Sequence, residues 1–169
     1  MSKIKAFIGC DPGASGALCL LKVPEDKPIE IYFLDHDKTM DVEKFIWLKQ
    51  AGEELNIRMA MLEEVHSLFG MSAKSNFSFG GAFHKAKLLL ELQLNYGFDL
   101  VTPKVWQKTV GIPNKKPKEK RTSAQLKKLV EKQCKQLYPG CDIYTPRGKL
   151  LDGRSDALMI AHYCMLKYK

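Results

Sequence analysis

The feature that most constrains the fold is a run of three short apolar segments at the start of the chain, joined by brief connections. The segments cover residues 3–10, 17–23 and 29–34, and turn residues such as glycine, proline and aspartate separate them. Strands that follow one another with such short connections pair as an antiparallel meander. We therefore expect the chain to begin with three antiparallel strands.

Strand and helix patterns alternate after this meander. A helix is predicted over 41–55, capped by Asp41 and with Phe45 and Leu48 facing inward. It is followed by a strand over 57–62 and a Gly/Ser/Phe-rich loop over 67–81. A helix over 82–95 and a strand over 99–101 come next. Three helices complete the chain: a short one that starts at Thr102-Pro103 and ends by Gly111, one capped by Thr122 or Ser123 that runs to about 137, and one over 151–167. This order predicts one α/β domain over residues 1–169, with a mixed five-stranded sheet flanked by helices.

The composition excludes several classes of protein. No apolar run approaches the roughly 20 residues of a membrane span, and the N-terminus lacks the apolar core and cleavage site of a signal peptide. We therefore expect a cytoplasmic protein that does not bind membranes. The absence of a CxxC pair favours buried reduced thiols over a zinc site at the five cysteines, which are Cys10, Cys19, Cys134, Cys141 and Cys164.

Positive charge is concentrated in one part of the chain. Residues 101–149 contain 13 Lys and Arg against 3 Asp and Glu, whereas the remainder contains 14 against 16. A surface that binds a polyanion has this distribution of charge. A solvated face without a ligand would have it as well, so the charge identifies a partner only if a chemical site lies beside it.

Four acidic residues occupy positions suited to chemistry. Asp11 follows the first predicted strand inside DPGASG, and Glu63 follows the fourth in MLEE. Asp152 and Asp156 lie four residues apart, on one face of the last predicted helix. Carboxylates at strand ends are costly to bury without a compensating cation, and Mg²⁺ prefers carboxylate oxygens. Acids that converge on a phosphate suit a site with two Mg²⁺ ions, for which Mn²⁺ can substitute.

Each of these acids also has a structural interpretation. Asp11 could cap the tight turn that follows it, and Glu63 could be an ordinary exposed acid. Asp152 could be the N-cap of the last helix, which would leave Asp156 on the surface. The combination of strand-end acids with the basic stretch favours a nuclease over four unrelated structural roles.

The motifs around these acids resemble those of the RuvC family of Holliday junction endonucleases, in the RNase H and retroviral integrase superfamily. IGCDPGASGAL resembles the first family motif, MLEEV the second and DGRSDALMIAHYC the closing one, while VTPKVWQKTVGIPNKKPKEK resembles the family's lysine-bearing stretch that contacts DNA. The resemblance implies an RNase H-like fold, with Asp11, Glu63 and Asp156 as catalytic metal ligands. Bacterial members carry a further His or Asp three residues before the last ligand, whereas Gly153 stands there in this chain. That role is therefore assigned to Asp152.

The resemblance also implies contacts with DNA. Family members insert aromatic side chains at the junction centre, and Phe69 and Phe79 are the candidates for this stacking, whereas Phe83 is expected in the core. Phosphate contacts are predicted for Lys104, Lys108, Lys115, Lys116, Lys118, Lys120 and Arg121.

These observations predict a crossover junction endodeoxyribonuclease that resolves Holliday junctions by symmetric, metal-dependent hydrolysis, in the cytosol of a bacterium or a phage-infected host. Two symmetric incisions favour a homodimer, and the apolar stretch at 88–94 is one candidate interface. The expected partner is four-way branched DNA, with no small-molecule cofactor. The alternatives are a nuclease of the same fold with broader branched-DNA or RNA–DNA hybrid specificity, and a DNA-binding module without catalysis.

Overall fold

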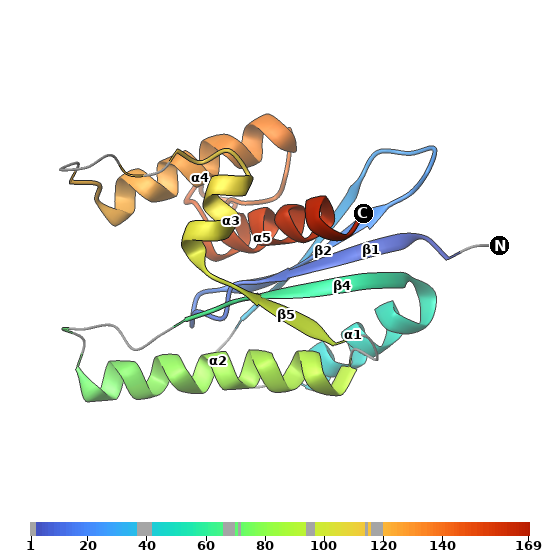
Figure 1. Ribbon diagram of the computed structural model, residues 1–169, viewed down its shortest axis with the longest axis horizontal. Coiled ribbons are helices and arrows are strands. Elements are labelled where there is room, and N and C mark those ends of the chain that lie inside the picture. Colours follow the sequence, from blue (N-terminus) through green and yellow to red (C-terminus); the bar gives the residue numbers. More distant parts are fainter. Residues whose placement is uncertain are drawn as a thin grey trace.

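Five strands form one mixed sheet in the order β3-β2-β1-β4-β5 (Figure 1). Their bounds are β1 Lys5–Cys10, β2 Ala17–Val23, β3 Glu30–Asp35, β4 Asn56–Glu63 and β5 Phe98–Val101. β2 pairs antiparallel with both β1 and β3, while β4 pairs parallel with both β1 and β5. The predicted meander and the mixed five-stranded sheet are therefore confirmed.

The computed structural model describes residues 3–36, 42–65, 70, 72–93, 97–113, 115 and 120–169. Several predicted positions lie outside the described residues, namely the cap Asp41, the stacking candidate Phe69 and the basic residues Lys116 and Lys118, as does the side chain of Phe45. The remaining predicted site residues can all be located.

Helices cover both faces of the sheet (Figure 1). Their bounds are α1 Val42–Glu54, α2 Ala73–Gln93, α3 Pro103–Thr109, α4 Ser123–Leu137 and α5 Asp152–Tyr168. α1 and α2 lie on one face, and α3, α4 and α5 lie on the other. None of the helices in the described part of the chain is long and apolar enough to cross a membrane.

Alternation along the strands divides the core into two layers. On the α5 face, Phe7, Leu21 and Met61 are buried with Trp106 from α3. On the α2 face, Ile8, Leu20 and Leu62 are buried with Leu48 and Leu90 from the helices. Because side chains point alternately to the two faces of a strand, the stretches 6–10 of β1, 17–21 of β2 and 60–62 of β4, which are apolar and buried, lie between both helical layers.

α2 begins at Ala73, so the prediction of a loop over 67–81 was wrong for its second half. Ser72 provides the missed start signal, because its Oγ accepts a hydrogen bond from the Ser75 N–H at 3.1 Å. Gly80 and Gly81 suggested a loop, but both lie within the helix. An interior glycine costs a helix only about 1 kcal/mol relative to alanine, which the packing of the apolar end of α2 offsets.

The helix starts in the basic stretch agree with the sequence. α3 begins at Pro103 after the N-cap Thr102, and Gly111 follows its end with φ +89°. At α4, the Thr122 Oγ1 accepts from the Gln125 N–H at 3.2 Å, and the Gln125 side chain accepts from the Thr122 N–H at 2.8 Å. These caps fix where the two helices begin beside the sheet.

Candidate active site

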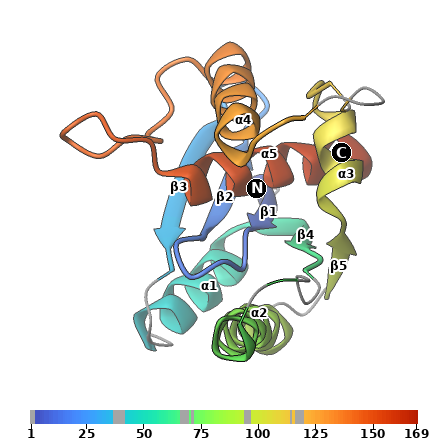
Figure 2. The same cartoon turned by 90° about the vertical axis from the view of Figure 1, so that its left-hand side faces the viewer.

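Two of the predicted acids lie at the ends of adjacent parallel strands. Asp11 follows the last residue of β1, and Glu63 is the last residue of β4. The two strands pair in parallel with Cys10 opposite Leu62, so the next residue of each strand emerges at the same edge of the sheet. Figure 2 looks onto this edge, where the turn after β1 lies beside the start of α5. A crevice at the carboxyl ends of strands is the usual place for a site in such sheets.

The DPGASG turn fixes the Asp11 side chain. The Gly13 N–H donates to Asp11 Oδ1 at 2.9 Å, and the turn closes through Gly16 N–H, which donates to the Gly13 carbonyl at 2.8 Å. Asp11 therefore does stabilise its own turn, as the structural interpretation proposed. That role leaves Oδ2 for other interactions at the strand end.

α5 reaches this edge because its backbone packs directly on β1. A Cβ placed on Gly9 would lie 2.2 Å from the Ala161 nitrogen and 2.4 Å from the Ala157 carbonyl oxygen. Only glycine allows this approach, since the atoms in the way belong to the helix backbone. The close contact aligns α5 along β1 and brings its first turns beside Asp11.

Gly153 lies in the first turn of α5 and is bridged to Gly16 of the DPGASG turn. A Cβ at Gly153 would lie 2.1 Å from the Ser15 carbonyl oxygen, so no side chain fits at this position. The contact explains physically why an acid cannot stand at residue 153 in this chain. Asp152 is the first residue of α5, and the N-cap is Leu151 rather than Asp152.

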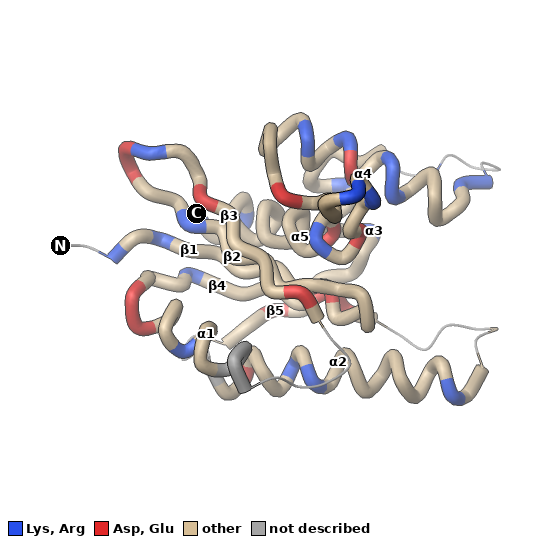
Figure 3. Tube along the Cα trace, turned by 180° about the vertical axis from the view of Figure 1, so that it is seen from behind, with Lys and Arg blue, Asp and Glu red and all other residues tan. Residues whose placement is uncertain are grey.

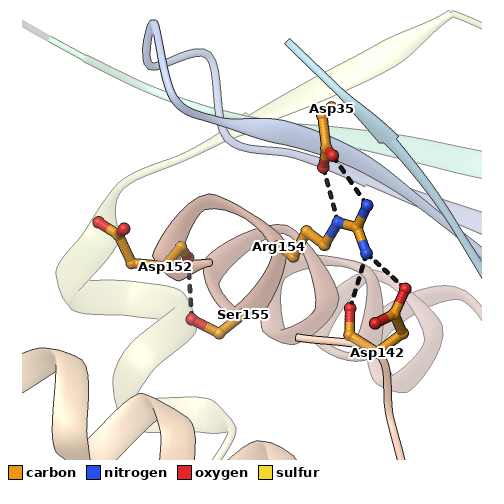
Figure 4. Close-up of polar contacts among 5 residues, drawn as sticks. All are labelled: Asp35, Asp142, Asp152, Arg154 and Ser155. Carbon is orange, nitrogen blue, oxygen red and sulfur yellow. Dashed lines mark hydrogen bonds and ion pairs between the residues drawn. The ribbon is translucent and has the colours of Figure 1, made fainter. Parts of the chain in front are cut away.

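Arg154 holds the start of α5 against the rest of the fold (Figure 4). Its guanidinium donates to both carboxylate oxygens of Asp35, at 2.7 and 2.8 Å, and to Asp142 Oδ2 at 2.6 Å. Asp35 ends β3, and Asp142 lies in the segment before α5. Figure 4 shows Arg154 and Asp152 pointing in different directions from the same helical turn. Bidentate pairing of this kind is geometrically specific, so Arg154 positions the turn that carries Asp152.

The four acids interact electrostatically. The pKa of Asp11 is raised to about 6, mainly by burial and in part by the Asp152 charge, against the lowering effects of the Gly13 N–H and Lys127. Burial raises the pKa of Glu63 to about 7, with a contribution from Asp11 that the Trp106 hydrogen bond opposes. Burial also raises the pKa of Asp156 well above its usual value, and Asp11, Glu63 and Asp152 add to the effect. These four acids, called here the acid cluster, are thus within electrostatic range of one another, and their negative charges outnumber the positive charge of Lys127 that acts on them.

Two residues of this cluster were not identified from the sequence. Trp106 on α3 is 1% exposed, and its Nε1–H donates to Glu63 Oε1 at 2.8 Å. Lys127 on α4 forms an ion pair with Asp152 Oδ2 at 2.5 Å and interacts electrostatically with Asp156 and Asp11. Trp106 resembles a core residue in the sequence, and Lys127 is one of many lysines, so their roles follow only from where α3 and α4 pack.

Within the described ranges, no three Asp, Glu, His or Cys side chains stand close enough together to form a metal-binding group.

The five cysteines form no disulfide, and Cys10, Cys19, Cys134 and Cys164 are buried, as expected for structural thiols.

The predicted DNA-binding residues lie on and beside α3 and α4. Lys104, Lys108, Lys115 and Lys120 are exposed, and Arg121 donates from Nη1 to the Pro113 carbonyl at 2.6 Å. Figure 3 shows basic positions gathered along α4 and the segment before it, on the α5 side of the sheet. The basic stretch therefore borders the acid cluster, which the charge distribution alone could not establish.

The aromatic candidates belong to α2. Phe79 is half-buried, and Phe83 packs against the core as expected. Phe77, which was not among the stacking candidates, is 84% exposed. It is thus the most exposed large apolar side chain of the described residues.

The free energy of unfolding of the metal-free protein is expected to fall as the pH rises from about 5 to 8. The carboxyls of Asp11 and Glu63 titrate at about 6 and about 7 in the folded chain, against ordinary values of 3.8 and 4.5. The folded chain therefore binds more protons than the unfolded chain in this window, and raising the pH favours unfolding. Urea unfolding in EDTA at several pH values measures the slope. Asp11→Asn should reduce the slope, and an unchanged slope would contradict the buried-acid cluster.

Comparison with known proteins supports the fold. No family profile matches the chain, and no curated protein matches it. Among solved structures, Thermus thermophilus RuvC aligns with a TM-score of 0.60 at 13% identity, over 96% of this chain and 97% of that one. T. thermophilus RuvC in complex with a Holliday junction substrate aligns with a TM-score of 0.58 at 11% identity, over 94% and 91% of the two chains. The chain therefore has the fold of RuvC, with a five-stranded mixed sheet and flanking helices in the same arrangement.

Proposed function

We propose that this protein is a metal-dependent, structure-selective endonuclease that resolves four-way DNA junctions by symmetric incision. One observation carries the proposal: four acids from the ends of β1 and β4 and the first turns of α5 interact electrostatically at one edge of the sheet, beside the basic stretch. The RuvC fold adds support, because one RuvC with this fold was solved with a Holliday junction substrate. Catalysis of this kind corresponds to a crossover junction endodeoxyribonuclease.

We infer that Asp11, Glu63, Asp152 and Asp156 hold Mg²⁺, with Mn²⁺ as a substitute and two ions per site. The donor set fits, because oxygen ligands suit hard cations, and burial followed by mutual repulsion raises the pKa values of three acids, an effect that a bound cation would oppose. Mg²⁺ in such sites stabilises charge on the phosphate and activates water for in-line attack.

The chain's own residues orient these ligands. The Gly13 N–H donates to Asp11 Oδ1 at 2.9 Å, and the Trp106 Nε1–H donates to Glu63 Oε1 at 2.8 Å. Arg154 fixes the first turn of α5, and with it Asp152. Lys127 pairs with Asp152 and interacts electrostatically with Asp156 and Asp11, so it supplies positive charge at the acids.

Lys127→Ala is expected to slow junction cleavage by about 10²-fold, because it removes the ion pair with Asp152. Among the described residues, no other charged side chain forms an ion pair with that carboxylate. Single-turnover cleavage rates at saturating protein measure the effect. Lys128→Ala is the matched control, since Lys128 is the adjacent exposed lysine on α4. Equal rates for the two variants would remove Lys127 from the proposed site.

Phosphate contacts are assigned to the basic residues on α3 and before α4, which are Lys104, Lys108, Lys115, Lys120 and Arg121, together with Lys116 and Lys118 outside the described residues. Stacking on unpaired bases is assigned to Phe69 and Phe79, and the exposure of Phe77 adds it as a third candidate. Aromatic stacking is sequence-tolerant, which suits recognition of a branch point rather than a sequence.

We infer a homodimer, because two symmetric incisions require two sites related by a two-fold axis. α2 presents an apolar face for it: Phe77, Leu88 and Leu92 are 84%, 43% and 61% exposed at helical spacing. Leu88→Glu with Leu92→Glu is expected to convert the dimer to a monomer in sedimentation, whereas Leu166→Glu, a 52% exposed leucine on α5, should not. A monomeric wild-type protein would contradict the dimer.

A panel of labelled substrates tests the proposal. Four-way junction, linear duplex, flap and RNA–DNA hybrid are incubated with the protein in Mg²⁺, in Mn²⁺ and in EDTA. Metal-dependent cutting confined to the junction is the expected result. If flaps or hybrids were cut equally well, the protein would be a nuclease of broader specificity rather than a junction resolvase. Binding without cutting in either metal would favour a DNA-binding module.

A further inference from the structure

A pocket of about 660 Å³ lies between α3 and the start of α4. Its lining combines three cations, Lys104, Lys115 and Arg121, with the apolar side chains of Ile112 and Leu126, and includes no carboxylate among the described residues. Pockets that enclose small molecules span roughly 300–1,000 Å³, so this one is large enough for a nucleotide. Contact with phosphate alone requires no apolar wall, whereas a nucleobase has an apolar face and polar edges.

The pocket shares its two walls with the acid cluster. On α3, Gln107 lines the pocket, and the preceding Trp106 donates to Glu63. On α4, Leu126 lines the pocket, and the following Lys127 pairs with Asp152. The pocket and the acid cluster are therefore built on the same two helices, α3 and α4.

The walls are held in place before any ligand binds. Ile112 is 3% exposed, and its N–H donates to the Gln107 carbonyl at 2.9 Å. The Thr122–Gln125 capping box fixes the start of α4, and the Arg121 guanidinium is bonded to the Pro113 carbonyl. A pre-formed wall reduces the ordering cost of binding and can discriminate between bases.

We propose that this pocket binds one nucleotide of the cleaved DNA strand, next to the phosphate at the acids. The base would lie against Leu126 and Ile112, Gln107 would contact the base edge, and Lys104, Lys115 and Arg121 would hold the adjoining phosphate. The inference rests on the proposed function and deepens it, because a base in this pocket would give a junction-selective nuclease a preference for certain nucleotides at the cut.

Titration of the metal-free, isotope-labelled protein by NMR tests the pocket independently of cleavage. A 5′-phosphorylated DNA dinucleotide is expected to shift the Leu126 and Ile112 methyl signals in a saturable way, whereas inorganic phosphate should leave them unchanged. Lys104→Ala should weaken dinucleotide binding at least about threefold more than Lys108→Ala, an exposed lysine of the same helix that does not line the pocket. Unchanged methyl signals would overturn the inference. The inference would also be overturned if a nucleoside monophosphate bound more tightly than the dinucleotide and junction DNA did not displace it. The pocket would then be a site for a free nucleotide.

Cleavage of junctions that differ only in the nucleotides flanking the cut distinguishes this inference from the proposed function. Gln107→Ala is expected to change the ratio of products by at least about threefold while the total rate stays measurable. Dinucleotide binding in the pocket without any cleavage would retire the nuclease and keep the nucleotide site. Cleavage with no nucleotide preference, together with unchanged methyl signals, would retire the nucleotide site and keep the nuclease.

Discussion

Asp11→Asn is expected to lower the rate of junction cleavage by about 10³-fold or more and to leave junction binding within about threefold of wild type. The substitution removes a charged ligand from the acid cluster and keeps the size of the side chain. The asparagine Oδ1 can still accept the Gly13 N–H that holds the turn at 2.9 Å. Binding should survive because the phosphate contacts are proposed for residues of α3 and of the segment between α3 and α4, not for the acids.

The matched control is Asp26→Asn, which makes the same chemical change at an exposed position between β2 and β3. It should cleave at the wild-type rate. Single-turnover cleavage and a mobility-shift assay in EDTA measure the two quantities separately. If Asp11→Asn cleaved within about tenfold of wild type, Asp11 would not be a ligand of the reacting centre. If binding and folding were lost with cleavage, Asp11 would have only the structural role of capping its turn.

Gly9→Ala is expected to reduce the free energy of unfolding by about 3 kcal/mol or more, at or above the upper end for overpacked cores. The added Cβ would meet backbone atoms of α5 at 2.2 and 2.4 Å, and no side-chain rotation relieves a clash with backbone. α5 must therefore move away from β1. Since α5 carries Asp152 and Asp156, any folded fraction should also cleave poorly.

Gly80→Ala is the control for this prediction. It makes the same change within α2, where nothing lies within 4 Å of the added Cβ, so it should stabilise the protein by about 0.5–1 kcal/mol. Urea unfolding monitored by fluorescence and circular dichroism measures both variants. A Gly9→Ala protein within about 1 kcal/mol of wild type would show that α5 is not packed as tightly on β1 as the structure indicates.

The positions of the acids could be predicted because they depend on local patterns. A strand that ends at a tight turn places Asp11, an apolar strand that ends in Glu63 places the second acid, and a four-residue spacing places Asp152 and Asp156 on one helix face. Only the topology decides whether these sites meet. β1 and β4 are adjacent and parallel, which brings two strand ends together that lie far apart in the sequence.

The parts that the sequence did not reveal depend on contacts between distant elements. The Lys127 ion pair exists because α4 crosses the start of α5, and the Trp106 hydrogen bond exists because α3 packs over the end of β4. Gly153 looked like a departure from the family pattern, and the structure shows that the DPGASG turn fills the space of its side chain. The start of α2 was missed for a local reason, because Gly80 and Gly81 outweighed the cap at Ser72.

Cleavage of a cruciform extruded from a supercoiled plasmid tests the central claim most directly. With Mg²⁺, the wild-type protein is expected to produce linear DNA whose two incisions map to symmetric positions on opposite strands, and to produce none in EDTA or with Asp11→Asn. Intact plasmid in both Mg²⁺ and Mn²⁺, or nicked circles with incisions scattered outside the cruciform, would contradict junction resolution by this protein.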